Sequence, residues 1–255
     1  MARLFSVLVL ACVSVAFGQI PAGPETLRYA VEWRLVPAGT ARLSFTPLAP
    51  QSGAAGPATA SEVRLHLESA GLVSRLFRVE DDYTSLLGQN LCAQSEFLSA
   101  REGSRNKETR VLFDSAGRRA TWQEKDLVRN VTSTKDVETP ACVHDVLGGL
   151  MVLRTLRMEP GTTTRIPLSD GKKFVQARVE AQEREELKTD LGVLKTIRYE
   201  IYLFNNVLYK RPGHLHVWLT DDEKRTPVQL QVRMQFAIGT ITFRLQKPAD
   251  PPPAR

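Results

Sequence analysis

The segment VQLQVRMQF, residues 228–236, alternates apolar and polar side chains at every step. In an extended chain the apolar side chains share one face, and glutamine or arginine occupies the other. A period of two predicts a β-strand with one buried face and one face in water. One wet face is typical of antiparallel sheets rather than of parallel sheets covered by helices.

The same alternation recurs along the chain, in residues 27–35, 41–46, 62–68, 175–181 and 197–203. Turn sequences lie between such segments, and their glycines can adopt the positive φ that tight turns need. These turns are Pro37-Ala38-Gly39, Asp114-Ser115-Ala116-Gly117, Ser169-Asp170-Gly171 and Thr189-Asp190-Leu191-Gly192. About a dozen strand candidates at this spacing predict an all-β, mainly antiparallel fold.

One stretch breaks the two-residue period. Between Asp145 and Met158 the apolar residues recur at helical spacing, and Asp145 can cap the start of the helix. Gly148 and Gly149 each cost a helix about 1 kcal/mol relative to alanine, which we interpret as a sign of close contact with a sheet. We therefore expect a strongly curved sheet or half-barrel with one central helix packed on its concave face. A second, short helical turn is predicted at residues 72–77.

The two ends of the chain differ from the middle. Residues 1–18 combine Arg3, an apolar run and small residues before Gly18, which is typical of a removable signal peptide. The alternatives are a hydrophobic first core element and a lipid anchor on Cys12. We expect one β-rich domain over residues 19–246 and a proline-rich, disordered or extended tail over residues 247–255. Past the signal peptide, no segment has the roughly 20 apolar residues that span a membrane.

The cysteines and the charge limit the location and the partners. Cys92 and Cys142 remain after signal removal, and an even count outside the cytoplasm favours a disulfide over two separate buried thiols. The formal net charge is +6, and the basic residues are spread among acidic ones. Nucleic-acid binders concentrate such charge on one face, so we expect no nucleic-acid partner. A weak attraction to anionic lipid head groups or polysaccharide and a solvated, mixed-charge surface remain as alternatives.

His214 and His216 are the strongest candidates for metal binding. Residues two apart on a strand share a face, so both imidazoles can meet one Zn²⁺. A catalytic zinc needs a third protein ligand, for which His144 or His66 is a candidate. Trp218 lies on the same face and fits a wet or rim-facing surface. Two histidines fall short of a ligand set, and we predict neither a metal nor any other cofactor.

Two charged candidates have ordinary structural explanations. Asp221 begins an acidic cluster whose position between strands indicates a turn. Arg154 lies late in the apolar helix, where it either meets a buried carboxylate or carbonyl partner or extends its charge to the solvent. The sequence contains no G-x-S-x-G elbow, phosphate loop or dinucleotide fingerprint, so we predict no catalytic residues.

Six short motifs, taken in order, resemble one bacterial exported family, domain of unknown function 3108. They are Leu27-x-Tyr29-x-Val31-x-Trp33 with Ala38-Gly39-x-Ala41, Phe113-Asp114, Asp145 with Leu153-Arg154, Asp170-Gly171-Lys172, Gly192-x-Leu194-x-Thr196, and Leu215-x-Val217-Trp218-Leu219-x-Asp221-Asp222 with Pro227-Val228. The resemblance covers roughly residues 25–245, with a departure at Gly148-Gly149-Leu150-Met151, where small and aromatic residues are expected. It implies a β-rich periplasmic or outer-envelope protein of Gram-negative-type bacteria without an established activity. By fold analogy alone, it is similar to the half-barrels of periplasmic lipoprotein carriers and sensors.

These observations lead to three functional hypotheses. The first is a non-catalytic, exported envelope protein that binds a lipid, a lipoprotein, an envelope polymer or a protein partner in the sheet's concavity. The second is a zinc-assisted envelope hydrolase that uses His214 and His216. The third is a structural or assembly factor that docks other envelope proteins through its strand edges and its tail.

Overall fold

The computed structural model describes residues 21–49, 59–88, 90–235 and 239–248. The predicted signal peptide with Cys12, Phe236 of the opening strand and residues 249–255 of the predicted tail lie outside these ranges. No helix in the described ranges is long and apolar enough to cross a bilayer.

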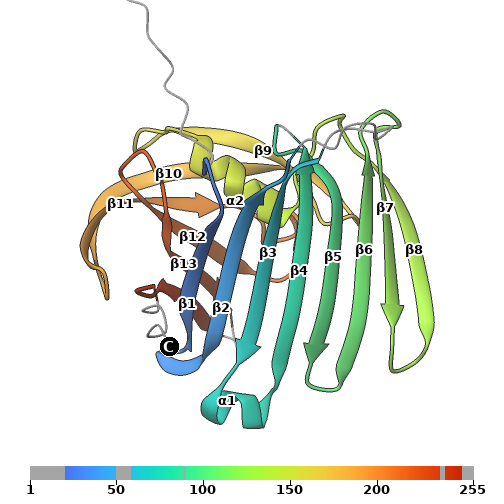
Figure 1. Ribbon diagram of the computed structural model, residues 1–255, viewed down its shortest axis with the longest axis horizontal. Helices are drawn as coiled ribbons and strands as arrows, with labels where there is room; N and C mark the ends of the chain where they lie inside the picture. Colours follow the sequence, from blue (N-terminus) through green and yellow to red (C-terminus); the bar gives the residue numbers. More distant parts are fainter. Residues whose placement is uncertain (1–20, 50–58, 89, 236–238, 249–255) are drawn as a thin grey trace, which may run out of the picture.

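Fourteen strands form one curved antiparallel sheet in the described part of the chain (Figure 1), which confirms the predicted fold class. In chain order they are β1 (Glu25–Trp33), β2 (Val36–Pro47), β3 (Thr59–Ser69), β4 (Val79–Gly88), β5 (Ala93–Glu102), β6 (Arg105–Asp114), β7 (Arg119–Asp126), β8 (Val131–Glu138), β9 (Thr163–Ser169), β10 (Phe174–Thr189), β11 (Gly192–Ile201), β12 (Gly213–Thr220), β13 (Pro227–Met234) and β14 (Thr240–Leu245).

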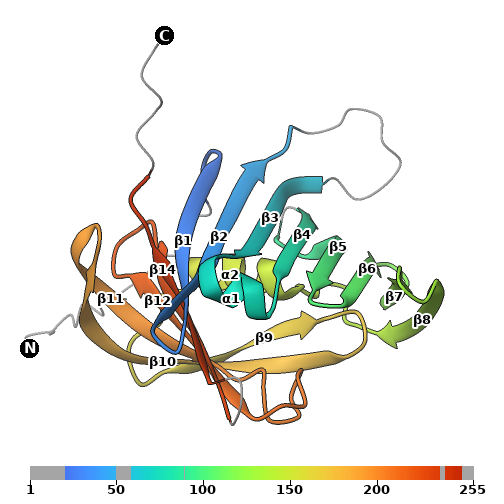
Figure 2. The same cartoon turned by 90° about the horizontal axis from the view of Figure 1, so that it is seen from below.

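The sheet consists of two meanders joined in its centre. The spatial order is β8-β7-β6-β5-β4-β3-β2-β1-β14-β13-β12-β11-β10-β9, so the first and last strands of the described chain pair, with Tyr29 opposite Leu245. The sheet curls until the turn between β9 and β10 meets β6–β8 (Figure 2). There the ammonium of Lys172 lies 3.9 Å from the centre of the Trp122 ring, and Lys135 donates to the Lys172 carbonyl at 2.7 Å. The result is a rolled, open sheet rather than a closed barrel.

Helix α2 (Val146–Thr155) lies inside the curve of the sheet, as predicted (Figure 2). The carboxylate of Asp145 accepts a hydrogen bond from the Gly148 amide at 2.6 Å and so caps the helix. The helix ends at Thr155, before the predicted end at Met158, because the backbone of Leu156 is extended. A Cβ on Gly149 would stand 2.5 Å from a methyl group of Leu168, which confirms the predicted close contact of helix and sheet.

The predicted turns are confirmed with one exception. Three of them lie between β6 and β7, β9 and β10, and β10 and β11. The prediction for Pro37-Ala38-Gly39 is wrong, because these residues lie within β2 and the chain turns at Arg34 and Leu35 instead. Both turn residues have positive φ, 51° and 69°, although neither is glycine, asparagine or aspartate. The second predicted helical turn is α1 (Gly71–Leu76), one residue earlier than expected.

Two contacts hold α2 in place. Cys92, before β5, and Cys142, before α2, form the predicted disulfide, with their Cα atoms 5.1 Å apart. The helix also joins two apolar clusters, since Leu147 and Met151 pack with β2–β7 and Leu153 packs with β9–β12. The helix therefore fills one end of the concave space.

Candidate functional site

Apolar side chains that are only partly buried line the concave face of the sheet. Along β3, Val63 is fully buried near α2, whereas Leu65 and Leu67, which follow it on the same face, are half-buried. Leu230 on β13 and Phe243 on β14 are half-buried in the same apolar cluster. Complete burial of an apolar side chain stabilises by about 1.5–3 kcal/mol. Covering these half-buried side chains with another apolar surface would therefore be favourable. We take this concave apolar face as the candidate site.

A buried acidic cluster borders this face at the start of α2. The hydroxyl of Ser85 donates to the carboxylate of Asp145, whose second oxygen caps the helix. Glu96 lies opposite Ser85 in the sheet, and its Oε2 atom is buried without a hydrogen-bond partner in the described structure. Burial, with the negative charges of Asp145 and Asp170, raises the pKa of Glu96 to about 8. The Glu96 carboxyl is therefore mostly protonated at neutral pH and adds a hydrogen-bond donor to the concave wall.

Other polar groups on this face shift in the same direction. Burial raises the pKa of Asp81 to about 6, with the nearby carboxylate of Glu102 adding to the effect. Burial also raises the pKa of the Tyr83 hydroxyl. The concave face therefore combines apolar side chains with the neutral carboxyl of Glu96 and the Tyr83 hydroxyl, whereas Asp81 is mostly ionised at neutral pH. Such a mixed lining suits an amphipathic ligand.

Arg154 is a buried ion-pair partner rather than an extended surface cation. Its side chain is 2% exposed and contacts the carboxylate of Glu25 on β1 at 2.5 and 3.1 Å. It also donates to the carbonyl oxygens of Lys224 and Arg225 at 3.2 Å each. These bonds satisfy most of the guanidinium and fix the end of α2 to the sheet, so Arg154 is a structural residue.

His214 and His216 lie on the face of β12 opposite Leu215 and Val217, with their ring centres 6.2 Å apart. Both approach Glu200, His214 at 2.7 Å and His216 at 3.9 Å. Burial opposes the ionisation of Glu200, but the hydrogen bond with His214 and the neighbouring His216 lower its pKa overall.

The two predicted candidates for a third zinc ligand lie elsewhere. His144 bonds the Leu91 carbonyl at 2.7 Å, and His66 bonds Asp82 at 2.8 Å. Among the described residues no group of three or more His, Cys, Asp or Glu side chains has a metal-binding arrangement. The His214–His216 pair therefore lacks the ligand set on which the hydrolase hypothesis depends.

The remaining predicted residues are Trp218, on β12, and Asp221, in the turn that follows it. The expectation of a wet Trp218 is wrong: the side chain is 6% exposed, and its indole N–H donates to Glu185 at 2.6 Å. Asp221 lies in the predicted turn between β12 and β13 and accepts a hydrogen bond from Arg184 at 2.9 Å.

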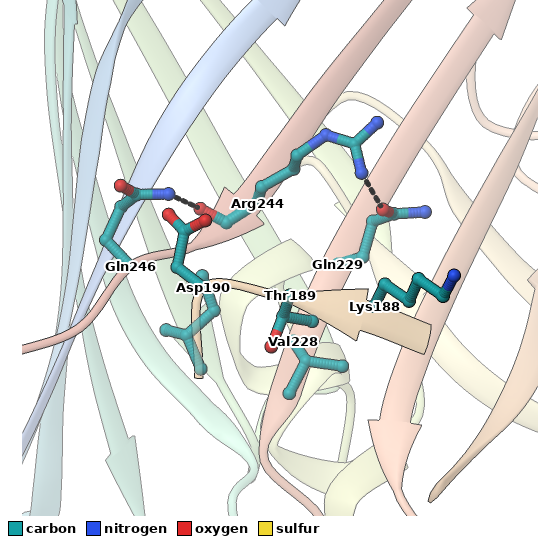
Figure 3. Close-up of a pocket in the computed structure, with 8 residues that line it drawn as sticks. Lys188, Thr189, Asp190, Val228, Gln229, Arg244 and Gln246 are labelled. Atoms are coloured by element: carbon teal, nitrogen blue, oxygen red, sulfur yellow. Dashed lines mark hydrogen bonds between the residues drawn. The ribbon is translucent and has the colours of Figure 1, made fainter. Parts of the chain in front are cut away.

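A cavity of about 320 Å³ separates the β10–β11 turn from β13 and β14 (Figure 3). Arg244 donates to Gln229 at 3.0 Å and to Glu32 at 3.1 Å, and Gln246 donates to the Arg244 carbonyl at 3.3 Å. The Arg244 guanidinium is thus held by neighbouring side chains, and the apolar residues of the lining, Val228 and Leu245, are already buried. We do not place the functional site there.

Sequence reasoning missed three residues that shape the site. Glu96 and Asp81 are acidic residues on strands, and no sequence motif marks them as facing the interior. Glu25 lies 129 residues from Arg154, and nothing in the sequence links the two. A strand pattern that places a carboxylate on the apolar face was the one signal available, and it is present at Asp81 and Glu96.

The comparisons with known proteins agree with this architecture. The chain is similar in fold to a solved structure described as a β-barrel-like protein of domain of unknown function DUF1849 from Brucella abortus. The TM-score is 0.52 with 8% identity, over 88% of this chain and 96% of that one, so the likeness concerns the fold alone. No curated protein matches the chain significantly. The model of a family of proteins of unknown function, DUF3108, matches residues 28–246, and the chain therefore belongs to the DUF3108 family.

Proposed function

We propose that this protein is an exported, non-catalytic binding or carrier protein of the cell envelope. Its ligand is amphipathic, such as a lipid, the acyl part of a lipoprotein, or an envelope polymer, and lies against the concave apolar face. The observation that carries the proposal is the set of half-buried apolar side chains that the sheet turns inward and α2 leaves uncovered.

Two further features support this proposal. The neutral carboxyl of Glu96 and the hydroxyl of Tyr83 give the face hydrogen-bonding groups that carry no charge. The disulfide between Cys92 and Cys142 agrees with an oxidising compartment, and signal cleavage after Gly18 would deliver the chain there. Sequencing the N-terminus of the protein isolated from the envelope fraction tests the export, and we expect it to begin at Gln19.

The ligand is tested with native mass spectrometry and with a fluorescent fatty acid added to the full chain. We expect the chain to bind the fatty acid, and we expect Leu65→Glu on the concave face to weaken binding at least about tenfold, because the carboxylate would lose its hydration there. Leu112→Glu is the matched control, since Leu112 is 63% exposed and lies on the outer face of β6. Equal binding by both variants, or a folded wild type that ignores the probe, refutes the proposal.

One observation favours a second use of the fold, as an assembly factor. Strand β8 ends the sheet, and seven of its eight residues are exposed. An open strand edge is a template for pairing with another extended chain. A photocrosslinker at Thr134, on β8, should then capture a defined envelope protein, whereas one at Arg110, on β6 and away from that edge, should not. No defined adduct at Thr134 excludes this use.

A further inference from the structure

Four connections between strands lie together at the end of the sheet opposite α2 (Figure 1). They are residues 33–36, 70–80, 101–106 and 126–131, which we call the arginine rim. Backbone hydrogen bonds link these connections: Gly103 donates to Arg78 at 2.7 Å and Leu127 to Asn106 at 2.9 Å. Ala70 donates at 2.8 Å to Ala38 on β2, two residues after the first connection. The rim is thus one continuous edge of the molecule.

Large apolar side chains project from this edge into the solvent. Leu35 is 83% exposed, Leu76 is 72% exposed and Val128 is 66% exposed. Eight of the exposed large apolar side chains belong to the rim, and they are Leu35, Val36, Leu72, Leu76, Phe77, Leu127, Val128 and Val131. Single exposed apolar residues are common, but a row of them along one edge marks an interaction surface.

The charge of the rim has one dominant sign. Its four segments contain six arginines and three carboxylates, a net charge of +3. Glu80 contacts two of the arginines, Arg78 at 2.9 Å and Arg101 at 3.4 Å, and Glu102 contacts Arg105 at 3.9 Å. Two of the three carboxylates therefore lie beside arginines, the third, Asp126, accepts hydrogen bonds from the Val128 and Arg129 amides, and the net charge of the edge is positive.

We propose that the arginine rim docks on the surface of an anionic lipid bilayer. Leucine, valine and phenylalanine side chains on turns can enter the boundary between head groups and acyl chains, and the arginines between them can bind lipid phosphates. Each basic residue near an anionic surface contributes about 1 kcal/mol, and several small anchors give reversible attachment. A protein partner is the competing occupant, and the test below separates the two.

The position of the rim links this docking to the concave apolar face. Strand β3 leads from the buried Val63 past Leu65 and Leu67 to the rim at Ala70, so the half-buried apolar side chains approach the same edge. A docked rim would bring the concave apolar face to the lipid surface. This last step rests on the proposed function, whereas the docking itself does not.

Vesicle co-sedimentation tests the docking. The full chain is mixed with vesicles of phosphatidylcholine alone or with about one third phosphatidylglycerol. We expect binding to the anionic vesicles that weakens at high salt because the arginine–phosphate attraction is screened. The variant Arg75→Glu/Leu76→Ser should bind at least about tenfold more weakly. The control Arg118→Glu/Leu112→Ser makes the same two changes outside the rim and should bind like the wild type.

Several outcomes overturn the proposal. They are no binding to anionic vesicles, equal binding to both kinds of vesicle, equal loss in the rim and control variants, or attachment that needs an added protein. Fatty-acid binding by the rim variant in solution separates the two proposals. If the rim variant still binds the fatty acid but no longer binds vesicles, the result supports docking through the rim. If the protein docks on vesicles but does not bind the fatty acid, the result contradicts the concave site and leaves the docking proposal intact.

Discussion

The two ends of the rolled sheet differ in the side chains that they bury and expose. At the end that holds α2, charged groups are buried and paired, as with Arg154 and Glu25, and a disulfide joins two loops. At the arginine rim, apolar side chains such as Leu35 and Leu76 are exposed between arginines. The difference indicates that stability is concentrated at the helix end and that the rim is available for interaction. Substitutions at the two ends should therefore differ in their cost to folding.

The largest effect is expected from the disulfide. The variant Cys92→Ser/Cys142→Ser releases a closed loop of 50 residues. Chain entropy predicts a loss of roughly 4 kcal/mol in the free energy of unfolding. Urea unfolding of the variant, beside the wild type with and without reductant, measures it. A loss below about 1 kcal/mol would show that the helix end is held by packing alone.

Breaking the buried ion pair should cost somewhat less. Glu25→Gln leaves the Arg154 guanidinium 2% exposed without its counter-charge, and we expect a loss of about 3 kcal/mol. In the double variant Glu25→Gln/Arg154→Met the orphaned charge is gone, so its loss should be smaller than the sum of the two single losses. Additive losses in the double-mutant cycle would contradict the coupling between α2 and β1.

The contact of α2 with β9 should respond to added volume. Gly149→Val places methyl groups against the buried Leu168 and should cost about 2 kcal/mol by overpacking. Adding Leu168→Ala makes room and should recover part of that loss. If the valine variant unfolds at the same urea concentration as the wild type, the helix is not in close contact with the sheet.

The acidic cluster makes stability depend on pH. The folded pKa of Glu96, about 8, lies above its ordinary value of 4.5, so the folded protein binds this proton more tightly. The resulting stabilisation is complete below pH 4.5 and is lost as the pH rises through 8. Asp81 shifts in the same direction with a pKa of about 6, and burial also raises the pKa of Asp145, so the decline above pH 7 belongs to Glu96 together with Asp145.

The expected decline between pH 7 and pH 8 is about 1 kcal/mol. Thermal unfolding at several pH values measures it, and Glu96→Gln should flatten the profile between pH 7 and pH 8. A wild type whose stability rises over that interval would contradict the burial of an uncompensated carboxyl.

The smallest effect is expected at the rim. Leu35→Ser/Leu76→Ser changes two side chains that are 83% and 72% exposed, and it should alter the free energy of unfolding by less than about 0.5 kcal/mol per site. A loss of 2 kcal/mol or more would mean that these side chains are buried in the protein as it exists, and the contrast between the ends would fail.

Much of the fold was predictable, because the two-residue period fixes which face of a strand is buried. The pattern at Val228, Leu230 and Val232 therefore gave the sheet, and Asp145 gave the start of α2. The turn at Arg34 and Leu35 was not predictable, since its positive φ values occur at residues that rarely adopt them. Long-range partners such as Glu25 and Arg154 leave no trace in local sequence, for their proximity depends on how the whole sheet curls.

The candidate site was predicted only in outline. A concave apolar face followed from one-sided strands, but the protonated Glu96 depends on which neighbours surround it in space. Trp218 shows the reverse error. A tryptophan beside two histidines suggested a wet surface, but its indole N–H donates to Glu185 on β10. Alternation tells which side a residue faces, not what covers that side.

The pairing of β1 with β14 determines when the molecule can be completed. Every other neighbouring pair of strands joins segments consecutive along the chain, but this one joins residues more than 200 positions apart, as with Tyr29 and Leu245. During synthesis β1 has one finished neighbour and an open edge until the final strand emerges. A pairing between segments so far apart in the chain forms slowly, and until it forms the open edge of β1 can pair with other extended chains. Loss of residues 240–245 would remove that partner of β1 and separate the two meanders, rather than merely shorten the sheet.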